Sequence, residues 1–393
     1  MPPKKVAEVE KKVILGRASN TLKLGLVGMP NVGKSTTYNV LSNLSVPAEN
    51  FPFCTIEPNT ARVEVPEPRV DKLCEIYNPK KKVYANISIT DIAGLVKGAS
   101  TGAGLGNAFL SHIQAVDGIF HVVRAFDNEE IIHEEGEVNP MRDMETITGE
   151  LIAKDLQNIE RRVPELDNLI TRKNLKPDKE ERDLLLRVKA LLEAGKWVKD
   201  GEWAARDIDG LNTHNFLTAK PVIYLINIGY QDYITKKNRW LPKVAEWIKN
   251  NGGGPMIPYS ADFEKAAIAN GHDLATRNAT AKELGAPSCI NKIIKLGYHT
   301  LQLIHYFTGG PDEVRCWTIR EGTKAPGAAG VIHTDFERGF ICAEVIKYDD
   351  IIQHGSEGAV KDEGLMKQRG KDYDVCDGDI ILFKFNVGPK AKK

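Results

Sequence analysis

Residues 22–36 read LKLGLVGMPNVGKST, and this stretch decides the fold. An apolar run, Leu24 to Val27, leads directly into the pattern Gly-x-x-x-x-Gly-Lys-Ser at residues 28–35. In this pattern the glycines let successive backbone N–H groups turn inward around a β-phosphate. Lys34 then reaches the β- and γ-phosphate oxygens, and the Ser35 hydroxyl can bind Mg²⁺. Because the pattern lies between a strand-like run and a segment without helix breakers, it predicts a nucleotide-binding phosphate loop.

Length and composition narrow the class of protein. A chain of 393 residues is longer than one ordinary core, which favours two or three domains. Hydrophobic residues make up 42% and charged residues 27%, and no apolar run approaches the roughly 18 residues that span a bilayer. The charged N-terminus lacks the apolar core and cleavage site of a secretion signal. We therefore expect a cytoplasmic protein, with the nucleus as a second location, and no membrane partner.

Charge and cysteine content exclude further classes. The six cysteines are scattered without a Cys-x-x-Cys pair, which argues against a zinc site or a disulfide framework. The formal net charge is zero, so contact with nucleic acid would depend on local basic patches and not on the whole molecule. We expect no sequence-specific DNA binding.

The loop at residues 48–59, AENFPFCTIEPN, follows the first predicted helix, which runs from Ser35 to Leu44. In P-loop nucleotidases a threonine in such a loop closes over the γ-phosphate and gives Mg²⁺ a second oxygen ligand. Thr55 is the candidate for this role. The alternative is a buried loop threonine without a ligand.

A second switch motif follows a predicted strand. Residues 83–92, VYANISITDI, alternate and then become apolar, as a strand of a mostly parallel sheet does. The strand ends in a D-x-x-G tetrapeptide, in which Asp91 can hold Mg²⁺ through water and the Gly94 N–H can contact the γ-phosphate. The tetrapeptide is common by chance, but its place after a phosphate loop and at a strand end supports the assignment.

The remaining pattern predicts an α/β fold with a doubly wound sheet and an insertion. Further buried strands are expected at residues 118–126, 220–228 and 256–261, alternating with helices, one of which continues to about Lys249. Residues 129–215 instead carry apolar residues at helical spacing among charges, interrupted by the turn-prone sequence NLKPD. This pattern predicts an antiparallel helical arm inserted into the nucleotide domain.

The base-recognition motif is incomplete. In GTPases the strand ends in Asn-Lys-x-Asp, whose Asp carboxylate accepts both the N1–H and the N2–H₂ groups of guanine. Here the tetrapeptide is Asn227-Ile228-Gly229-Tyr230, so the Asn is kept and the carboxylate is missing. Asp232 lies two residues further on and could reach guanine from a shifted loop. The alternative places it in the first turn of the next helix, where Asp is common. Ser260-Ala261 falls where the last base-contacting loop would be.

After a predicted helix at residues 290–304, short strands and turns indicate a small α+β domain. They are expected in EVRCWTI (313–319), GAAGVIHTDFERGFICAEVIKYDD (327–350) and YDVCDGDIILFKF (373–385). This domain has no catalytic arrangement, and we interpret His333 and Asp335 as a capping or turn pair. The predicted organisation is an N-terminal tail (1–20), a nucleotide-binding domain (21–128 and 216–304), an inserted arm (129–215), a C-terminal domain (305–388) and a basic tail (389–393).

Taken together with GLGNAFLSHI (104–113) and FTGGPDEVRCWTIREGTKAPGAAGVIHTDFERGF (307–340), these motifs resemble the YchF, or Obg-like ATPase, subfamily of translation-related P-loop GTPases. The resemblance extends over essentially the whole chain. It implies an Obg-type nucleotide domain with a coiled-coil arm and a C-terminal TGS domain of β-grasp type. It also implies hydrolysis of ATP in preference to GTP, and association with ribosomes.

The resemblance also implies roles for individual residues. The Mg²⁺ ligands fall on Ser35 and Thr55, and a histidine of the loop after D-x-x-G falls on His112. The nucleotide-binding residues would be Asn31, Val32, Gly33, Lys34, Ser35, Thr36, Asn227 and Ile228. One position departs from the family, which usually has Glu where this chain has Tyr230.

Two catalytic details depart from Ras-type GTPases. The residue after D-x-x-G is Leu95, whose apolar side chain cannot orient water, so His112 is the candidate for that task. In related GTPases an Asn at the position of Asn31 helps to hold K⁺, which can stand in for an arginine finger. Mg²⁺ is therefore the expected cofactor and K⁺ a second candidate.

Three functions compete at this point. The first is a nucleotide hydrolase that acts as a switch, and the second is a nucleotide-sensing scaffold with negligible turnover. The third, a phosphoryl transferase, is disfavoured because no acceptor-binding residues can be identified. The set Ser35, Thr55 and Asp91 favours hydrolysis, with ATP as the preferred substrate and GTP as the weaker one. A GTP-selective enzyme that uses Asp232 is the main alternative on specificity.

Overall fold

The computed structural model describes residues 15–17, 19–44, 59–94, 98, 105–133 and 136–386. These residues form two compact units. One comprises residues 15–17 together with Leu151–Lys220, and the other contains the remaining described residues. Within these ranges, none of the helices is both long and apolar enough to cross a membrane.

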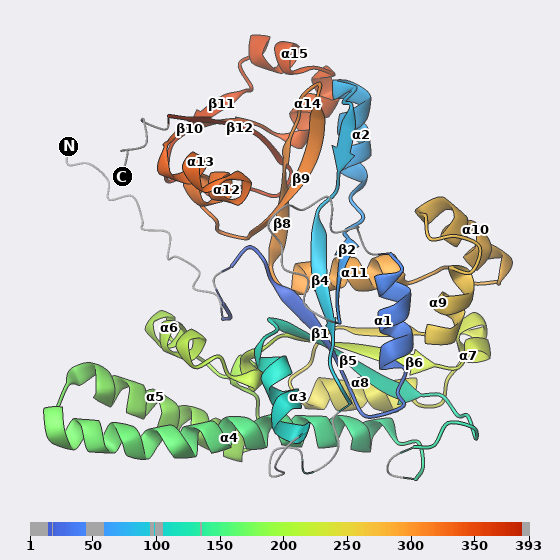
Figure 1. The fold of residues 1–393 in the computed structure, drawn as a ribbon, viewed down its shortest axis with the longest axis vertical. Coiled ribbons are helices and arrows are strands. Elements are labelled where there is room, and N and C mark those ends of the chain that lie inside the picture. Colours follow the sequence, from blue (N-terminus) through green and yellow to red (C-terminus); the bar gives the residue numbers. More distant parts are fainter. Residues whose placement is uncertain are drawn as a thin grey trace. The chain divides into compact units, whose positions relative to one another are not determined.

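The first sheet of the larger unit is the predicted doubly wound sheet (Figure 1). Its six strands lie in the order β2-β4-β1-β5-β6-β7, and all neighbours are parallel except β2 and β4. The strands are β1 (Lys23–Val27), β2 (Thr60–Glu64), β4 (Asn86–Asp91), β5 (Gly118–Ala125), β6 (Val222–Ile228) and β7 (Met256–Tyr259). β5 and β6 are buried along their whole length, which explains their nearly continuous apolar sequences.

Several helices flank this sheet or follow its strands. They are α1 (Lys34–Ser42), α3 (Leu105–Gln114), α7 (Tyr230–Thr235), α8 (Leu241–Asn250), α9 (Ala261–Ala267), α10 (Leu274–Glu283) and α11 (Ile290–Thr300). The single helix predicted up to Lys249 is wrong, because Lys236 has a φ of 56° and ends α7 before α8 begins. The helix predicted to reach residue 304 ends at Thr300.

The second sheet is mixed and has the order β11-β10-β12-β8-β9-β3. Its strands are β8 (Leu303–Thr308), β9 (Glu313–Arg320), β10 (Phe340–Ile346), β11 (Lys367–Arg369), β12 (Asp379–Phe385) and β3 (Lys81–Val83). The strand predicted over residues 83–92 is therefore corrected. Its first residue belongs to β3, which pairs with β9, and β4 begins only at Asn86.

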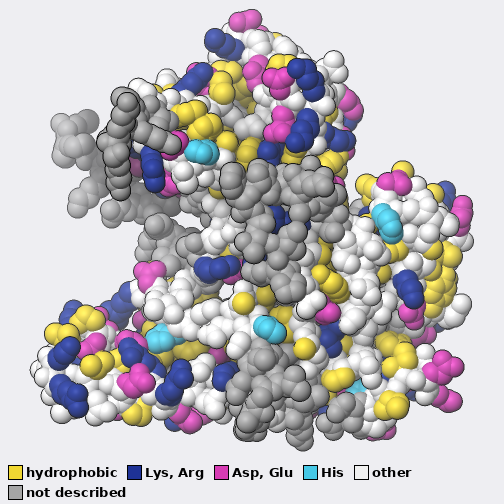
Figure 2. Space-filling view, in the orientation of Figure 1, with side chains coloured by type: hydrophobic (Ala, Val, Ile, Leu, Met, Phe, Trp, Pro, Cys, Tyr) yellow, Lys and Arg dark blue, Asp and Glu magenta, His cyan; other side chains and the backbone are white. Residues whose placement is uncertain are grey.

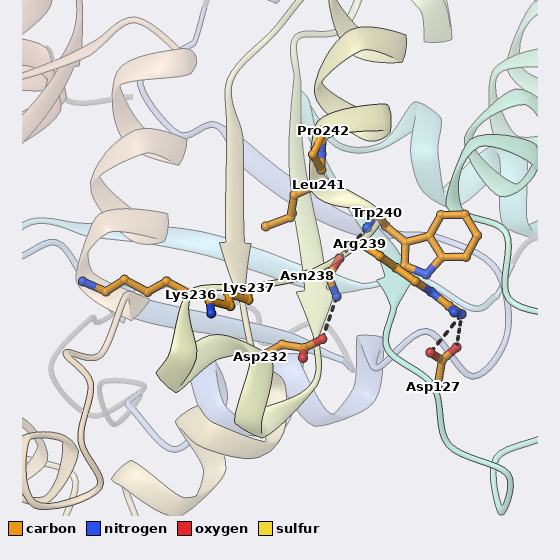
Figure 3. Close-up of a pocket in the computed structure, with 9 residues that line it drawn as sticks. All are labelled: Asp127, Asp232, Lys236, Lys237, Asn238, Arg239, Trp240, Leu241 and Pro242. Atoms are coloured by element: carbon orange, nitrogen blue, oxygen red, sulfur yellow. Dashed lines mark hydrogen bonds and ion pairs between the residues drawn. The ribbon is translucent and has the colours of Figure 1, made fainter.

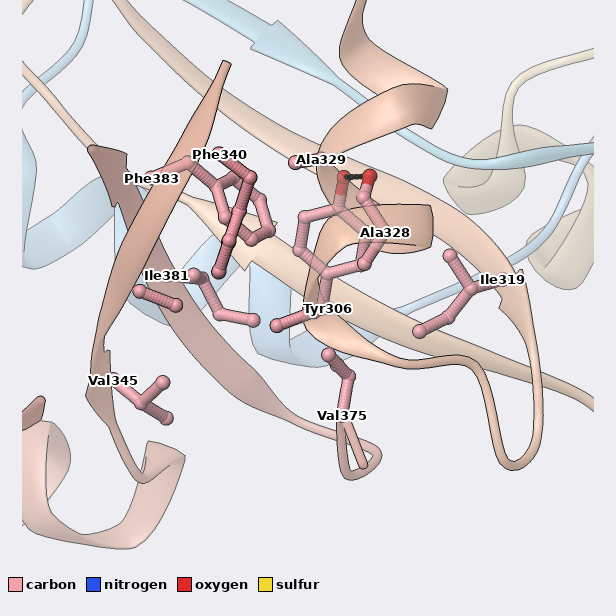
Figure 4. Close-up of a cluster of buried hydrophobic side chains, with 11 residues drawn as sticks. Tyr306, Ile319, Ala328, Ala329, Phe340, Val345, Val375, Ile381 and Phe383 are labelled. Carbon is pink, nitrogen blue, oxygen red and sulfur yellow. Dashed lines mark hydrogen bonds between the residues drawn. The ribbon is translucent and has the colours of Figure 1, made fainter. Parts of the chain in front are cut away.

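Two helices replace part of the strand pattern predicted for residues 327–350. They are α12 (Ala325–Ile332) and α13 (Thr334–Arg338), and β10 follows them. α12 packs its alanines against Tyr306, whose hydroxyl donates to the Ala328 carbonyl oxygen at 3.0 Å (Figure 4). His333 caps α13 by accepting a hydrogen bond from the Asp335 N–H at 3.1 Å, so the predicted capping pair is confirmed.

Helix α2 (Pro68–Tyr77) adds residues from the N-terminal part of the chain to the core of the second sheet. Its Val70 and Leu73 are buried with Phe307 and Val314, and with residues of α14 (Tyr348–His354) and α15 (Glu357–Asp362). The Arg69 guanidinium pairs with Asp377 at 2.8 Å. The domain limits given above remain predictions, and the observed packing shows that α2 and β3 share a core with residues 303–386.

The smaller unit contains the helical arm. Its main helices are α4 (Pro140–Lys173), which begins in the larger unit, α5 (Lys176–Glu193) and α6 (Ala205–His214), with short turns η2 (Val198–Asp200) and η3 (Leu217–Ala219). Ion pairs of Glu160 with Lys189 and of Asp167 with Arg182 show that α4 and α5 run antiparallel, as predicted. Figure 2 shows side chains of both charge signs interspersed over the surface of α5.

Candidate nucleotide-binding site

The phosphate loop occupies residues 28–33, between β1 and α1. Close contacts require two of its glycines. A Cβ on Gly28 would lie 2.4 Å from the backbone oxygen of Val122, and one on Gly33 would lie 2.3 Å from the Nδ2 of Asn227. Gly33 also has a φ of 98°, in the left-handed region. The glycines of the motif thus let the loop lie directly against β5 and β6.

The first turn of α1 offers backbone donors to an anion. Helix α1 begins at Lys34, and the Thr37 N–H donates to the Gly33 carbonyl oxygen at 3.0 Å. The N–H groups of Lys34, Ser35 and Thr36 come before that bond, so they have no acceptor within the helix. They also lie at the positive end of the helix dipole. A glycine-rich loop that ends in such a turn is suited to bind phosphate.

The Lys34 ammonium lies inside the loop. The residue is only 7% exposed, and its Nζ donates a hydrogen bond to the Met29 carbonyl oxygen at 2.7 Å. Burial lowers the pKa of Lys34 to about 8, while the charge of Asp91 opposes this shift. Phosphate oxygens beside the ammonium would stabilise its charged form and raise the pKa again. The buried Lys34 ammonium is therefore suited to bind an anion, whose negative charge would compensate its own positive charge.

Asp91 and Ser35 meet beside Lys34 and fit a magnesium ion. Asp91 ends β4, and the Ser35 hydroxyl hydrogen-bonds its carboxylate. Burial raises the pKa of Asp91, and the Lys34 charge and the Ser35 hydroxyl limit that rise. The Asp91 Oδ1 atom is buried and has no hydrogen-bond partner among the described residues. A buried and unsatisfied carboxylate oxygen is what a divalent cation or its bound water would complete.

Of the two other residues predicted at the phosphate end, the structure describes Gly94 but not Thr55. A Cβ on Gly94 would lie 3.2 Å from the Lys34 Nζ and equally close to Pro30, so the D-x-x-G end of β4 touches the phosphate loop. Thr55 lies outside the described residues. Its role as a second Mg²⁺ ligand stays a prediction.

Asn227 joins the phosphate loop to the loop after β7. The residue is 4% exposed, its Nδ2 donates to the Val32 carbonyl oxygen at 3.0 Å, and its Oδ1 accepts from the Ala261 N–H at 3.0 Å. Ser260, the residue before Ala261, caps α9. Asn227, the residue of the base motif that this chain retains, is therefore a brace between two loops.

The base end of the site lacks a carboxylate at the position of Tyr230. Ile228 is buried at the end of β6, and Tyr230 is the first residue of α7. The Tyr230 ring packs on Phe263 of α9, with the ring centres 5.6 Å apart. A phenol has one oxygen, so Tyr230 cannot accept the paired hydrogen bonds of guanine as a carboxylate does.

Asp232 lies in the first turn of α7, which was the alternative to a base-contacting role. Its Oδ2 accepts a hydrogen bond from the Asn238 Nδ2 at 2.7 Å. The same Nδ2 donates to the Ala125 carbonyl oxygen, at the end of β5, at 2.8 Å. The Asp232 carboxylate is thus fixed beside the end of β5.

Arg124 also belongs to this region, although no sequence motif marks it. Arg124 is 1% exposed, and its guanidinium donates to the carbonyl oxygens of Phe126, Asn128 and Ile131, at 3.2, 3.2 and 3.1 Å. A charged residue within the apolar strand 118–126 was the available signal, because a buried charge requires partners. These hydrogen bonds of Arg124 hold the backbone of the segment that follows β5 around its guanidinium.

Asn31 contacts that same segment. Its backbone has a φ of 58°, and its Nδ2 donates to the Ile132 carbonyl oxygen at 3.1 Å. The Asn31 side chain therefore joins the phosphate loop to the chain after β5, at a residue that Arg124 does not bond.

His112 is exposed on α3. Among the described residues, none hydrogen-bonds its imidazole, and the structure does not join it to Lys34 or Asp91. Its predicted role in catalysis stays a prediction, and the helix-surface alternative of the sequence analysis describes its present position.

Family models and curated proteins similar to this chain identify its family. Residues 23–154 match a family described as 50S ribosome-binding GTPase, and residues 303–386 match the C-terminal family YchF-GTPase_C, described as a protein of unknown function. The chain is 54% identical to Obg-like ATPase 1 of Oryza sativa subsp. japonica, 52% to that of Caenorhabditis elegans and 49% to that of Homo sapiens. Each of these alignments covers 100% of both chains.

A solved structure is also similar. The YchF GTPase of Schizosaccharomyces pombe superimposes with a TM-score of 0.86 at 46% sequence identity, covering 95% of this chain and 100% of the other.

Proposed function

The chain belongs to the YchF/Obg-like ATPase family of P-loop nucleotide hydrolases, and from this premise we propose that it hydrolyses ATP in preference to GTP, with Mg²⁺ as cofactor. The observation that carries the proposal is the unequal state of the two ends of the site. Lys34, Ser35 and Asp91 are assembled at the phosphate end. At the base end, Tyr230 replaces the carboxylate and packs on Phe263.

The preference for adenine follows from hydrogen bonding. Guanine presents two donors on one edge, and a site without a carboxylate there leaves both donors unpaired, which costs binding energy. The Tyr230 ring can stack on a purine, and its hydroxyl can accept a hydrogen bond from the adenine amino group. Ile228 would contribute its backbone at the end of β6. ATP should therefore bind at least as well as GTP, and GTP remains a weaker substrate.

The roles at the phosphate end follow from the same geometry. The N–H groups of the first turn of α1 and of the loop would bind the β-phosphate, and Lys34 would bridge the β- and γ-phosphates. Ser35 and Thr55 would hold Mg²⁺ directly, and Asp91 would hold it through water. When bound, Mg²⁺ neutralises charge that develops on the phosphates during transfer. Gly94, beside Lys34, would present its N–H to the γ-phosphate.

His112 is proposed to orient the attacking water. Its neutral imidazole can accept a hydrogen bond from that water, a task that the apolar Leu95 cannot perform. Because His112 is exposed and is hydrogen-bonded to no described residue, this role requires α3 to change position when nucleotide binds.

K⁺ is proposed as an additional cofactor at Asn31. The Asn31 Nδ2 is used by Ile132, which leaves its Oδ1 for a cation. Hydrolysis should then be slower when Na⁺ replaces K⁺ at constant ionic strength, and equal rates would remove K⁺ from the mechanism.

We also propose that the protein is a ribosome-associated nucleotide switch located in the cytoplasm, with the nucleus as a second location. The description of the family that matches residues 23–154 supports the ribosome as a partner. The arm and the second sheet would act as binding surfaces, since neither carries a candidate catalytic arrangement. Because the net charge is zero, binding would depend on local Lys and Arg clusters and should weaken as salt rises.

Single-turnover hydrolysis of ATP, measured with and without ribosomes, tests this function. We expect slow hydrolysis by the free protein and faster hydrolysis on ribosomes. Hydrolysis too slow to detect in both conditions would favour the nucleotide-sensing scaffold. Co-sedimentation with ribosomes that is equal in ATP, ADP and no nucleotide would contradict the switch.

A further inference from the structure

Two carboxylates lie near the C-terminal ends of β5 and β6, beside a surface pocket of about 620 Å³ (Figure 3). Asp127 follows β5, and Asp232 lies in the first turn of α7, which follows β6. Asp232 is the only acidic residue between Asn227 and Glu246 in the sequence. It is therefore the nearest replacement that the chain after β6 offers for the missing guanine-binding carboxylate.

Both carboxylates are engaged by consecutive residues, Asn238 and Arg239. The Arg239 guanidinium pairs with Asp127 at 3.0 Å, and the Asn238 amide donates to Asp232 at 2.7 Å. The dashed lines in Figure 3 show the two contacts side by side. Both oxygens of Asp127 and the Oδ2 atom of Asp232 are thus engaged.

Asn238 itself is fixed at every polar atom. Its two N–H groups are used by Asp232 and by the Ala125 carbonyl oxygen, and its Oδ1 accepts from the Trp240 N–H at 2.9 Å. An amide with three partners has one orientation, because a flipped amide would lose all three bonds. The Asp232 carboxylate is consequently held by a side chain that cannot follow it toward a nucleotide.

We propose that Asn238 is a specificity-determining residue of the nucleotide site, because it withholds the Asp232 carboxylate from the purine. This inference rests on the proposed preference for ATP and explains how the preference is kept. A free carboxylate near the base would accept the N1–H and N2–H₂ groups of guanine, whereas adenine offers a lone pair at N1 that repels it. The neighbouring pocket gives a released Asp232 room to change rotamer.

The test compares the ratio of the dissociation constants of GTP and ATP in three full-length proteins with Mg²⁺. In Asn238→Ala we expect the ratio of the GTP dissociation constant to the ATP dissociation constant to fall at least about tenfold relative to the unsubstituted protein. In the double variant N238A/D232A the ratio should return to its original value, because the released carboxylate is gone. Asn251→Ala is the matched control, since Asn251 caps the exposed end of α8. It should leave the ratio unchanged.

The outcomes separate this inference from the proposed function. If the unsubstituted protein prefers ATP and Asn238→Ala keeps the same ratio while folded by circular dichroism, the inference is overturned and the proposed function stands. If the unsubstituted protein prefers GTP, the proposed function fails and the inference fails with it.

If Asn238→Ala does not fold, the same ratio of dissociation constants is measured in Asp232→Ala. We expect its ratio to stay within about twofold of the original. A selective loss of GTP affinity would show that Asp232 already reads guanine, and that would overturn the role of Asn238.

Discussion

The two ends of the nucleotide site differ in where their contacts come from. At the phosphate end, the Lys34 ammonium donates a hydrogen bond to Met29 within its own loop, and Asp91 belongs to the D-x-x-G tetrapeptide. At the base end, Asp232 is controlled by Asn238, which belongs to no motif. The difference teaches that phosphate binding rests on residues of recognisable motifs, whereas the base selectivity proposed above rests on a contact that no motif records. Substitutions should therefore affect the two ends differently.

The largest effect is expected from Lys34→Ala, which removes the buried ammonium. We expect the affinities for ATP and GTP to fall together by at least about a thousandfold, roughly 4 kcal/mol, because both share the triphosphate. Isothermal titration calorimetry with each nucleotide measures this. A loss for ATP alone would break the comparison, since it would give the phosphate end a role in base choice.

Asn227→Ala should be next, because Asn227 bridges the phosphate loop and the loop after β7. The substitution leaves the Val32 carbonyl and the Ala261 N–H without their partner in a buried place. We expect the free energy of unfolding to fall by about 2–3 kcal/mol. Urea unfolding followed by circular dichroism measures the loss. An unchanged urea midpoint would mean that water replaces the Asn227 amide and that its bridge between the two loops does not stabilise the fold.

His112→Ala should lower kcat at least about tenfold, or 1.4 kcal/mol of barrier, while nucleotide affinity stays within about threefold. Affinity should change little because His112 contacts neither end of the site in the present structure, whereas kcat should fall because the attacking water loses the group proposed to orient it. Rapid-quench hydrolysis and fluorescence titration give the two quantities separately. Unchanged turnover would remove His112 from the mechanism.

Raising the pH should weaken nucleotide binding through Lys34. Burial lowers the pKa of the free Lys34 to about 8, and bound phosphates favour its charged form, so above that pH a proton must be taken up on binding. At pH 9 we expect affinities for ATP and GTP about tenfold below their values at pH 7. In Lys34→Arg, whose guanidinium stays charged, the dependence should disappear. A pH effect on only one nucleotide would place the titrating group at the base end.

The order of strand, phosphate loop and helix could be predicted from the sequence, because the motif that marks it is short and continuous. Gly28 and Gly33 are needed where the loop meets β5 and β6, and a motif of eight residues records that need. The strands and turns predicted from residue 327 onward were wrong where α12 lies. Pro326 is in the first turn of that helix, where its missing N–H costs nothing, and tertiary contact with Tyr306 favours the helix.

Contacts outside the motifs left no signal in the sequence. The pairing of Lys81 with Glu313 places β3 in the second sheet, and nothing in residues 81–83 indicates it. The bond between Asn238 and Asp232 depends on the left-handed Lys236 between them, which the sequence analysis placed inside one continuous helix. Both features follow only once the chain has folded.

Competition between ATP and GTP for the unsubstituted protein, at saturating Mg²⁺, tests the central claim most directly. The account predicts that ATP binds at least as tightly as GTP, because Tyr230 stands in place of the carboxylate that would pair with guanine. Affinity for GTP more than about tenfold above that for ATP, roughly 1.4 kcal/mol, would contradict it. If that preference were lost in Asp232→Ala, the chain would have kept guanine recognition by another route.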